Sequence, residues 1–272
     1  MKLYFLGPKG TYSELSAKKA VNFINKECEL IPVSTIAKVV DLVNRSFECA
    51  GILPVENSIE GIVRPTIDSL YPSECKIRAQ VDVEIKHCIA GYGKKENIKH
   101  IISHPQALLQ SQKYILENFD DKIDLISANS TAAAFNSLKE KDKTYAAIGS
   151  CVSAKELNLN IFDENIGDIK DNKTRFILIS RKDLNINKEN TRTSIVFNTE
   201  NRPGALLEIL EIFKKYNSNL IYLESRPSKT VFGEYNFIAD IDKGEDKIKD
   251  ALNEIEKHCN FYKMLGSYFT LE

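Results

Sequence analysis

The six residues 171–176, with the sequence DNKTRF, place a hydroxyl and a guanidinium side by side where a turn meets an apolar run. Asp-Asn is a turn signal, and residues 176–179 (FILI) have the composition of a buried strand. Polar residues at such a strand end lie where small-molecule sites of α/β proteins are usually found. Because neighbouring strand residues point in opposite directions, Thr174 and Arg175 are predicted to face different walls of one cleft. Taken alone, the segment fits an ordinary loop better than a site, so the rest of the chain has to decide.

Four further segments carry hydroxyl and amide side chains where an apolar run gives way to a turn or a helical pattern. They are 7–14 (GPKGTYSE), 54–61 (PVENSIEG), 103–110 (SHPQALLQ) and 128–134 (ANSTAAA). Helix starts expose backbone N–H groups and attract anions. None of the segments has the spacing of a P-loop, a dinucleotide-binding turn or a nucleophilic triad. Together they favour a small, oxygen-rich anion held by neutral donors.

Three side chains in these segments have both a chemical and an ordinary interpretation. Glu56 is a candidate acid or base, or else only a partner for Arg64. His104 is the histidine in the most site-like context, and it either exchanges protons or caps a helix. Glu14, three residues after Thr11, completes a capping box that would explain the first turn without a ligand.

Composition excludes several classes of protein. The 272 residues have a formal net charge of -1 with acids and bases interspersed, so neither nucleic acid nor an anionic membrane is an expected partner. No signal sequence and no apolar run of spanning length is visible, which predicts a cytoplasmic protein. The six cysteines are scattered and the four histidines lack ligand spacing, so neither a metal site nor a disulfide framework is expected.

The elements that would position these residues alternate between strands and helices. Strand patterns at 3–6, 30–33 and 50–55, separated by helical patterns, predict a βαβαβ unit with a mostly parallel sheet. A second α/β set follows, from a long strand pattern at 81–90 to the run at 176–179. We therefore predict a catalytic domain over 1–181 with two lobes, roughly 1–78 with 172–181 and 79–171, and a cleft between them.

The C-terminal part has a different pattern. Residues 181–191 are polar and lack an apolar period, as expected of a linker. Residues 192–272 read as βαββαβ, a ferredoxin-like module with one antiparallel sheet and helices on one face. Its sheet edge and remaining surfaces are predicted to be available for pairing.

Taken together and in order, these motifs resemble the prephenate dehydratase family over essentially the whole chain. GPKGTYSE, ILPVENSIEGIV (52–63), SHPQALLQ, NSTAAAF (129–135) and DNKTRF match its motifs, while NRPGALLEIL (201–210) and LESRP (223–227) match its ACT regulatory domain. Tyr12, Ile62 and Ser111 depart from the commoner residues, and Ile62 stands where a serine is usual. The resemblance implies a two-lobed catalytic domain like type II periplasmic binding proteins, plus a ferredoxin-like ACT domain, without an added chorismate mutase or dehydrogenase segment.

The implied activity is that of a lyase of phenylalanine biosynthesis, which converts prephenate to phenylpyruvate with loss of carbon dioxide and water. Aromatisation of the ring supplies the driving force, so no cofactor is expected. Two alternatives stay open. The first is arogenate dehydratase, which performs the same elimination on the amino analogue. The second is a non-catalytic, two-lobed solute-binding protein.

The resemblance also implies roles for individual residues. Thr174 is the residue expected to be essential, through a hydrogen bond to the departing hydroxyl, and Glu56 is the alternative as a general acid if burial keeps it protonated. Arg175 is the expected cation for a substrate carboxylate. The other expected substrate-binding residues are Thr11, Ser13, Asn57, Ser58, Ser103, Gln110, Ser130, Thr131 and Phe176.

For the ACT domain the resemblance implies phenylalanine as a feedback effector, bound where ACT domains meet. The matching residues are Asn201, Pro203, Gly204, Ala205, Leu206, Glu224, Ser225 and Arg226. A homodimer or homotetramer, assembled through the ACT and catalytic domains, is the expected state.

Overall fold

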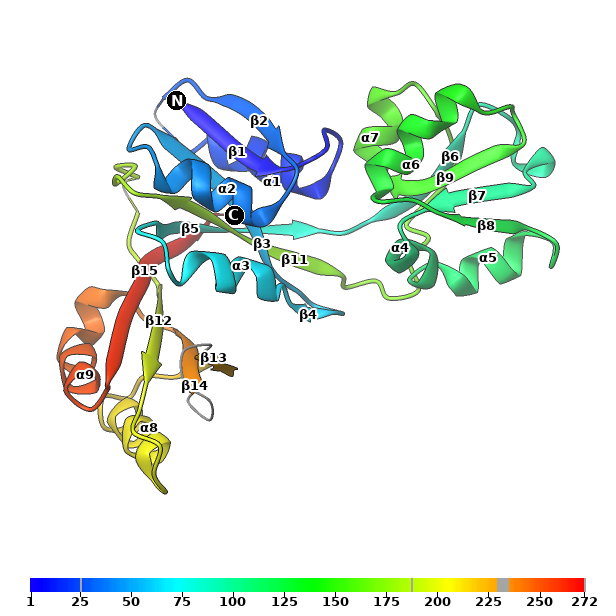
Figure 1. Cartoon of the computed structure of the whole chain (residues 1–272). Coiled ribbons are helices and arrows are strands. Elements are labelled where there is room, and N and C mark those ends of the chain that lie inside the picture. The colour runs from blue at the N-terminus through cyan, green and yellow to red at the C-terminus, as the bar shows by residue number, and fades with distance from the viewer. Residues whose placement is uncertain (25, 187, 229–234, 272) are drawn as a thin grey trace.

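The computed structural model describes residues 1–24, 26–186, 188–228 and 235–271, and shows two catalytic lobes and a C-terminal domain (Figure 1). Lobe 1 begins as the predicted βαβαβ unit, in which the first strand pairs in parallel with both of the others. Its elements are β1 (Lys2–Leu6), α1 (Tyr12–Val21), β2 (Glu29–Val33), α2 (Ile36–Asn44) and β3 (Cys49–Asn57). Thr11 and Thr35 cap the two helices through their side chains.

Two short elements after β3 are absent from the sequence-based prediction. They are β4 (Gly61–Ile62), which forms a hairpin with β3, and α3 (Arg64–Leu70), which has Pro65 in its first turn. Ile67 and Leu70 of α3 pack into the core of lobe 1. The polar residues 64–68 therefore lie on a helix rather than in a site loop.

The predicted strand at 81–90 is two strands in different sheets. β5 (Lys76–Glu84) pairs along its length with β11 (Lys173–Ser180) in lobe 1, whereas β6 (His87–Gly91) begins the sheet of lobe 2. The chain therefore crosses between lobes after Glu84, which corrects the predicted boundary at 78. It returns between β10 (Asn160–Glu164) and β11.

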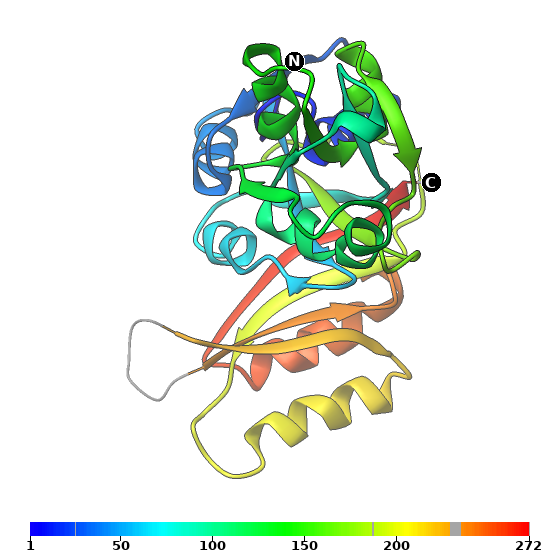
Figure 2. The ribbon, with the colours of Figure 1, turned by 90° about the vertical axis from the view of Figure 1, so that its right-hand side faces the viewer.

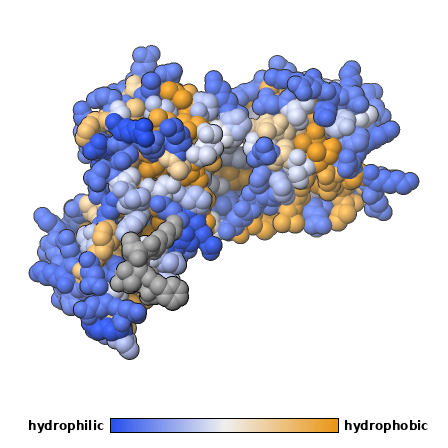
Figure 3. All heavy atoms as spheres, in the orientation of Figure 1, coloured by the Kyte–Doolittle hydropathy of each residue, from blue (hydrophilic) through white to orange (hydrophobic). Residues whose placement is uncertain are grey.

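Lobe 2 has a five-stranded sheet in the order β10-β6-β9-β7-β8. Its other elements are η1 (Lys95–Asn97), β7 (His100–Ser103), α4 (Pro105–Leu109), α5 (Gln112–Asn118), β8 (Asp124–Ser127), α6 (Thr131–Ser137), η2 (Leu138–Glu140), β9 (Tyr145–Ser150) and α7 (Cys151–Glu156). In Figure 3, apolar side chains gather along the lower side of this lobe, where α4 and α5 lie. Leu109, Leu116 and Leu125 are exposed there.

The C-terminal domain has the predicted βαββαβ order and the antiparallel strand order β13-β14-β12-β15. Its elements are β12 (Arg192–Asn198), α8 (Ala205–Lys215), β13 (Leu220–Pro227), β14 (Tyr235–Ile241), α9 (Glu245–Lys257) and β15 (Phe261–Leu271). One face of this sheet packs on α8 and α9 through residues such as Ile195 and Phe197.

The opposite face of that sheet, predicted to be open, is buried against lobe 1 (Figure 2). Val196, Ile238 and Tyr268 share one apolar core with Ile67 and Ile177 of lobe 1. Strand β15 also continues past its own domain, and its residues 269–271 pair in parallel with 79–81 of β5. Lobe 1 and the C-terminal domain therefore share a ten-stranded sheet. In the described part of the chain, no helix is long and apolar enough to cross a membrane.

Candidate active site

A cleft of about 440 Å³ lies between the two lobes and collects polar groups from both. Most of the predicted substrate-binding residues line it, together with Thr174. These are Thr11, Ser13, Asn57, Gln110, Ser130, Thr131 and Thr174. The structure therefore brings together residues that are 163 positions apart in the sequence (11 to 174).

Three helices begin at the rim of this cleft, and each is capped by a side chain. Thr11 Oγ1 accepts from the Glu14 N–H at 3.4 Å, and Ser130 Oγ accepts from the Ala133 N–H at 3.0 Å. His104 Nδ1 accepts from the Gln106 N–H at 3.4 Å, so this histidine has the capping role of its two interpretations. The starts of α1, α4 and α6 thus present partial positive charge to the cleft, whose lining also includes the carboxylate of Glu60.

The amide of Asn57 has a fixed orientation. Its Oδ1 accepts from the backbone N–H groups of Ile59 and Glu60 at 3.0 and 3.1 Å. Its Nδ2 therefore faces Thr174 Oγ1 at 3.0 Å and Asn172 Oδ1 at 2.7 Å, as the donor in both bonds. Because Thr174 Oγ1 accepts this bond, the hydroxyl hydrogen of Thr174 is left to donate elsewhere.

The chain of hydrogen bonds continues across the cleft into lobe 2. Asn172 Nδ2 donates to Gln110 Oε1 at 3.1 Å, and His87 Nε2 lies 3.3 Å from the same oxygen. Gln110 Oε1 can only accept, so His87 must carry its hydrogen on Nε2. The network runs from β3 and β11 of lobe 1 through the connecting segments to lobe 2.

The network ends in two buried polar atoms that have no hydrogen-bond partner among the described residues, His87 Nδ1 and Gln110 Nε2. Both residues line the cleft. Burial lowers the pKa of His87, although its bond to Gln110 opposes this, so the ring is neutral near pH 7. Buried polar atoms are normally satisfied, and unpartnered ones at a cleft indicate where a ligand binds.

Three of the predicted substrate-binding residues have structural roles instead. Ser103 is fully buried and donates to the Ile148 carbonyl at 2.7 Å. Ser58 accepts from the Lys173 N–H at 2.9 Å and donates to the Asp171 carbonyl at 3.2 Å, which fixes the turn before β11. Phe176 lies in the core of lobe 1. None of the three lines the cleft.

Arg175 and Glu56 also lie outside the cleft, contrary to expectation. Arg175 Nη1 is 2.7 Å from Asp240 Oδ2 of the C-terminal domain, and its Nε is 3.2 Å from Glu56 Oε2. Thr174 and Arg175 do point in opposite directions, but only Thr174 faces the cleft. The expected substrate contact of Arg175 and the expected acid role of Glu56 therefore have no support in this geometry.

The sequence matches the prephenate dehydratase family over residues 3–184 and the ACT domain over 193–260. The chain belongs to the prephenate dehydratase family. It is 42% identical to the prephenate dehydratase of Methanocaldococcus jannaschii over 265 residues, which cover 96% of this chain and 95% of that protein.

Solved structures agree with this assignment. The prephenate dehydratase of Arthrobacter aurescens, solved in complex with L-Phe, superposes with a TM-score of 0.88 at 31% identity, over 99% of this chain and 90% of that one. A structure described as GqqA, a novel type of quorum quenching acylase, superposes with a TM-score of 0.86 at 25% identity, over 98% and 97% of the two chains. The shared fold does not decide the activity, so the cleft residues have to.

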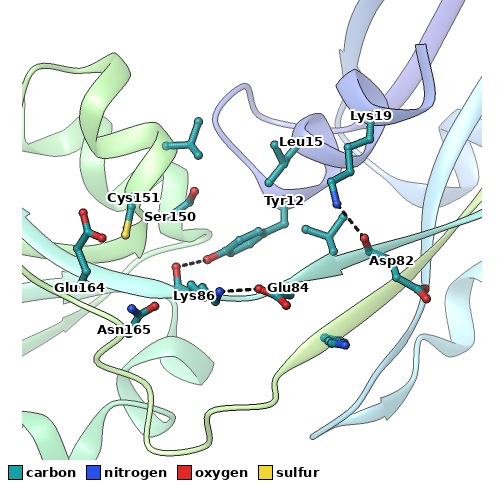
Figure 4. A pocket seen from close by; sticks show the side chains of 13 residues that line it. Tyr12, Leu15, Lys19, Asp82, Glu84, Lys86, Ser150, Cys151, Glu164 and Asn165 are labelled. Carbon is teal, nitrogen blue, oxygen red and sulfur yellow. Dashed lines mark hydrogen bonds and ion pairs between the residues drawn. The ribbon is translucent and has the colours of Figure 1, made fainter. Parts of the chain in front are cut away.

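A second hollow of about 580 Å³ lies on the other side of Tyr12 (Figure 4). The Tyr12 hydroxyl donates to the Lys86 carbonyl at 2.8 Å, which joins α1 to the crossover between the lobes. Two lysines that line this hollow bond to neighbouring protein groups: Lys86 Nζ to Glu84 at 2.6 Å, and Lys19 Nζ to the Asp82 carbonyl at 3.1 Å. Lys86 and Lys19 thus have protein partners, whereas Gln110 Nε2 of the smaller cleft has none among the described residues. Within the described ranges, no cluster of three or more potential metal ligands occurs.

The predicted effector residues fall into two groups. Residues 201–204 form the turn before α8, where Gly204 has a left-handed φ of 86° and Ala205 and Leu206 begin the helix. Glu224 and Arg226 instead project from β13 towards lobe 1, where Arg226 Nη2 lies 3.1 Å from Asp68 Oδ2 and Glu224 Oε1 lies 3.9 Å from Arg64 Nε. Ser225 lies between them on the exposed side of β13. Glu224 and Arg226 thus form ion pairs with residues of lobe 1.

Sequence reasoning missed two members of the cleft network. Asn172 belongs to the turn signal of a motif already singled out, and that signal alone predicts no contact with a ligand. The sequence pattern predicts His87 within a continuous strand, and only the break between β5 and β6 places it at the cleft.

Proposed function

We propose that this chain converts prephenate to phenylpyruvate, releasing carbon dioxide and water. One observation carries the proposal: Asn57 holds Thr174 Oγ1 as an acceptor, so the Thr174 hydroxyl hydrogen is available to a ligand in the cleft. The starts of α1, α4 and α6 supply partial positive charge for a dianionic substrate.

The elimination requires two bonds to break in one ring. Electrons of the bond to the leaving carboxylate enter the ring, which becomes aromatic, and the C4 oxygen departs with its bonding pair as hydroxide, which takes a proton from the solvent to become water. Thr174 stabilises the departing oxygen by donating a hydrogen bond, which acts where negative charge develops. Neither lysine nor arginine is among the residues described as lining the cleft. A carboxylate that no cation holds loses its charge more readily as carbon dioxide.

Glu56 is not assigned the role of general acid in this mechanism, because its carboxylate faces Arg175. A Glu56→Gln variant is therefore expected to keep the wild-type pH–rate profile. Loss of the acidic or basic limb of that profile would restore Glu56 as a proton donor.

The assay that tests the activity is incubation of the purified protein with prephenate, followed by the alkaline enolate absorbance of phenylpyruvate. Parallel incubation with arogenate, read as phenylalanine formed, separates the two dehydratase activities. We expect turnover of prephenate. Turnover of arogenate alone would identify arogenate as the substrate. Tight binding of both compounds without product would favour a solute receptor.

We further propose that phenylalanine binds to the ACT domain and regulates this activity, as the L-Phe complex of the Arthrobacter aurescens protein suggests. The N–H groups exposed at the start of α8 suit the carboxylate of the amino acid, and Asn201 or a backbone carbonyl suits its ammonium. We also propose that the chain assembles, through its ACT and catalytic domains, into a homodimer or homotetramer in the cytoplasm. Unchanged activity and unchanged small-angle scattering at saturating phenylalanine would reject this regulation.

A further inference from the structure

The guanidinium of Arg175 forms a buried link between the catalytic domain and the ACT domain. Its Nη1 contacts Asp240 Oδ2 at 2.7 Å, and its Nε lies 3.2 Å from Glu56 Oε2. The side chains of Arg175 and Asp240 are only 10% and 7% exposed. A pair so well shielded from water is screened far less than a surface pair.

The ACT sheet fixes the position of the Asp240 carboxylate. Its Oδ1 accepts from Ser194 Oγ at 2.6 Å, and Ser194 Oγ lies 2.8 Å from the hydroxyl of Tyr268. These residues come from β14, β12 and β15, so three adjacent strands hold the carboxylate. Burial lowers the pKa of Arg175, but Asp240, Tyr268 and Glu56 together outweigh this effect, and the net pKa is raised.

Arg175 is bonded directly to the residue that carries the proposed chemistry. Thr174 pairs with Asn57 and Arg175 with Glu56 across β11 and β3, and the register then shifts before Phe176. Such an irregularity next to a site re-aims side chains and bends the strand. One strand end therefore presents Thr174 to the cleft and Arg175 to the ACT domain.

We propose that Asp240 of the ACT domain is a positioning residue for the active site. It holds Arg175, and through the peptide between Arg175 and Thr174 it sets the position of the Thr174 hydroxyl in the cleft. This inference rests on the proposed function of Thr174. It gives an effector a direct mechanical route, because a movement of β14 against β11 must move or break this ion pair.

The test is the kinetics of an Asp240→Asn variant of the full chain with prephenate. We expect kcat to fall by about ten- to hundredfold with KM little changed, because a small displacement of a catalytic group lowers the rate more than it lowers binding. Asp240→Glu is expected to recover most of the activity, since it restores the charge. The matched control is Asp68→Asn, which removes another interdomain ion pair, to Arg226 at 3.1 Å, and should leave kcat and KM unchanged.

A double-mutant cycle separates positioning from general damage to the interface. If Asp240 acts through Arg175, the variant that combines Arg175→Met with Asp240→Asn is no slower than Arg175→Met alone. Ser194→Ala is a milder change that removes one hydrogen bond to Asp240, and it is also expected to lower kcat. It serves as the test if Asp240→Asn fails to fold.

Unchanged kcat in Asp240→Asn and Ser194→Ala, or additive effects in the cycle, would overturn the inference while leaving the proposed function intact. An equal loss in Asp68→Asn would also overturn it, because any weakened interface would then suffice. A wild-type protein without activity would reject the proposed function, and this inference with it.

Discussion

The inter-lobe cleft and the interface with the ACT domain meet at two adjacent residues of β11, and they differ in the polar groups that they contain. The cleft around Thr174 is lined by amides and hydroxyls together with the carboxylate of Glu60, and the described residues leave His87 Nδ1 and Gln110 Nε2 without partners. At the interface, the buried guanidinium of Arg175 donates to Asp240 at 2.7 Å, and its Nε lies 3.2 Å from Glu56 Oε2 without forming a hydrogen bond. Unsatisfied neutral groups indicate a ligand, whereas paired buried charges indicate a contact that must hold two parts of one chain in register.

The comparison predicts that changes at the interface cost stability. Arg175→Met leaves the Asp240 carboxylate buried without its cation, so the free energy of unfolding should fall by about 3–5 kcal/mol. Urea denaturation followed by circular dichroism measures it. Arg64→Met is the control, because Arg64 is 68% exposed and 3.9 Å from Glu224, and such a surface pair contributes at most about 1 kcal/mol. Equal losses of unfolding free energy in both variants would contradict this difference between the buried and the surface ion pair.

Changes in the cleft should cost activity without a loss of stability. Asn57→Asp keeps the oxygen that accepts from Ile59 and Glu60 but removes the donor to Thr174. The Thr174 hydroxyl then donates to the new carboxylate, and kcat should fall about a hundredfold, the lower range for losing assistance to a leaving group. Steady-state kinetics give kcat, and an unchanged urea midpoint shows that the fold is intact. A variant with normal kcat would mean that the orientation of Thr174 does not depend on Asn57.

A smaller effect is expected at the contact between α1 and the crossover. Tyr12→Phe removes the hydrogen bond to the Lys86 carbonyl, and the free energy of unfolding should fall by about 1 kcal/mol. Activity should remain within a few-fold of wild type, because the hydroxyl of Tyr12 makes no contact with the cleft network. Thermal unfolding and kinetics in parallel test both statements. A large loss of kcat would place the Tyr12 hydroxyl in the site.

The smallest effect concerns pH. The pKa of His87 in the folded protein lies below its ordinary 6.5 because the ring is buried. The unfolded chain therefore takes up a proton first, so this contribution to stability is complete above about pH 6.5 and is lost as the pH falls through the window down to the folded pKa. Urea midpoints of wild type and His87→Gln at pH 8 and pH 5 measure the difference. If both proteins lose equal stability between these values, His87 is not the group responsible.

Much of the fold follows from local patterns, and the errors occur where long-range packing decides. The helix cap at Thr11 is a local feature that the sequence pattern predicts, and the caps at Thr35 and Ser130 are equally local. The apolar run at 81–90 contains no local mark of the point where the chain leaves one sheet for another. The same holds for β15, whose end enters the sheet of lobe 1.

In the candidate site, too, local patterns predict some features and long-range packing decides the others. Alternation along β11 predicts that Thr174 and Arg175 face opposite sides, but not that the ACT domain covers one of them. The docking of that domain, through Ile238 and Tyr268 on Ile67 and Ile177, is a tertiary contact between distant segments. The sequence alone therefore predicts Arg175 in the cleft, whereas the structure places it at the interface.

The central claim is that the hydroxyl of Thr174 assists the departing oxygen, and the comparison of Thr174→Val with Thr174→Ser tests it most directly. Valine keeps the shape of the side chain without the hydroxyl, whereas serine keeps the hydroxyl. We predict that with prephenate kcat falls at least about a hundredfold in Thr174→Val, with an unchanged circular dichroism spectrum, and that Thr174→Ser keeps most of the activity. Near-normal turnover by Thr174→Val would contradict the account.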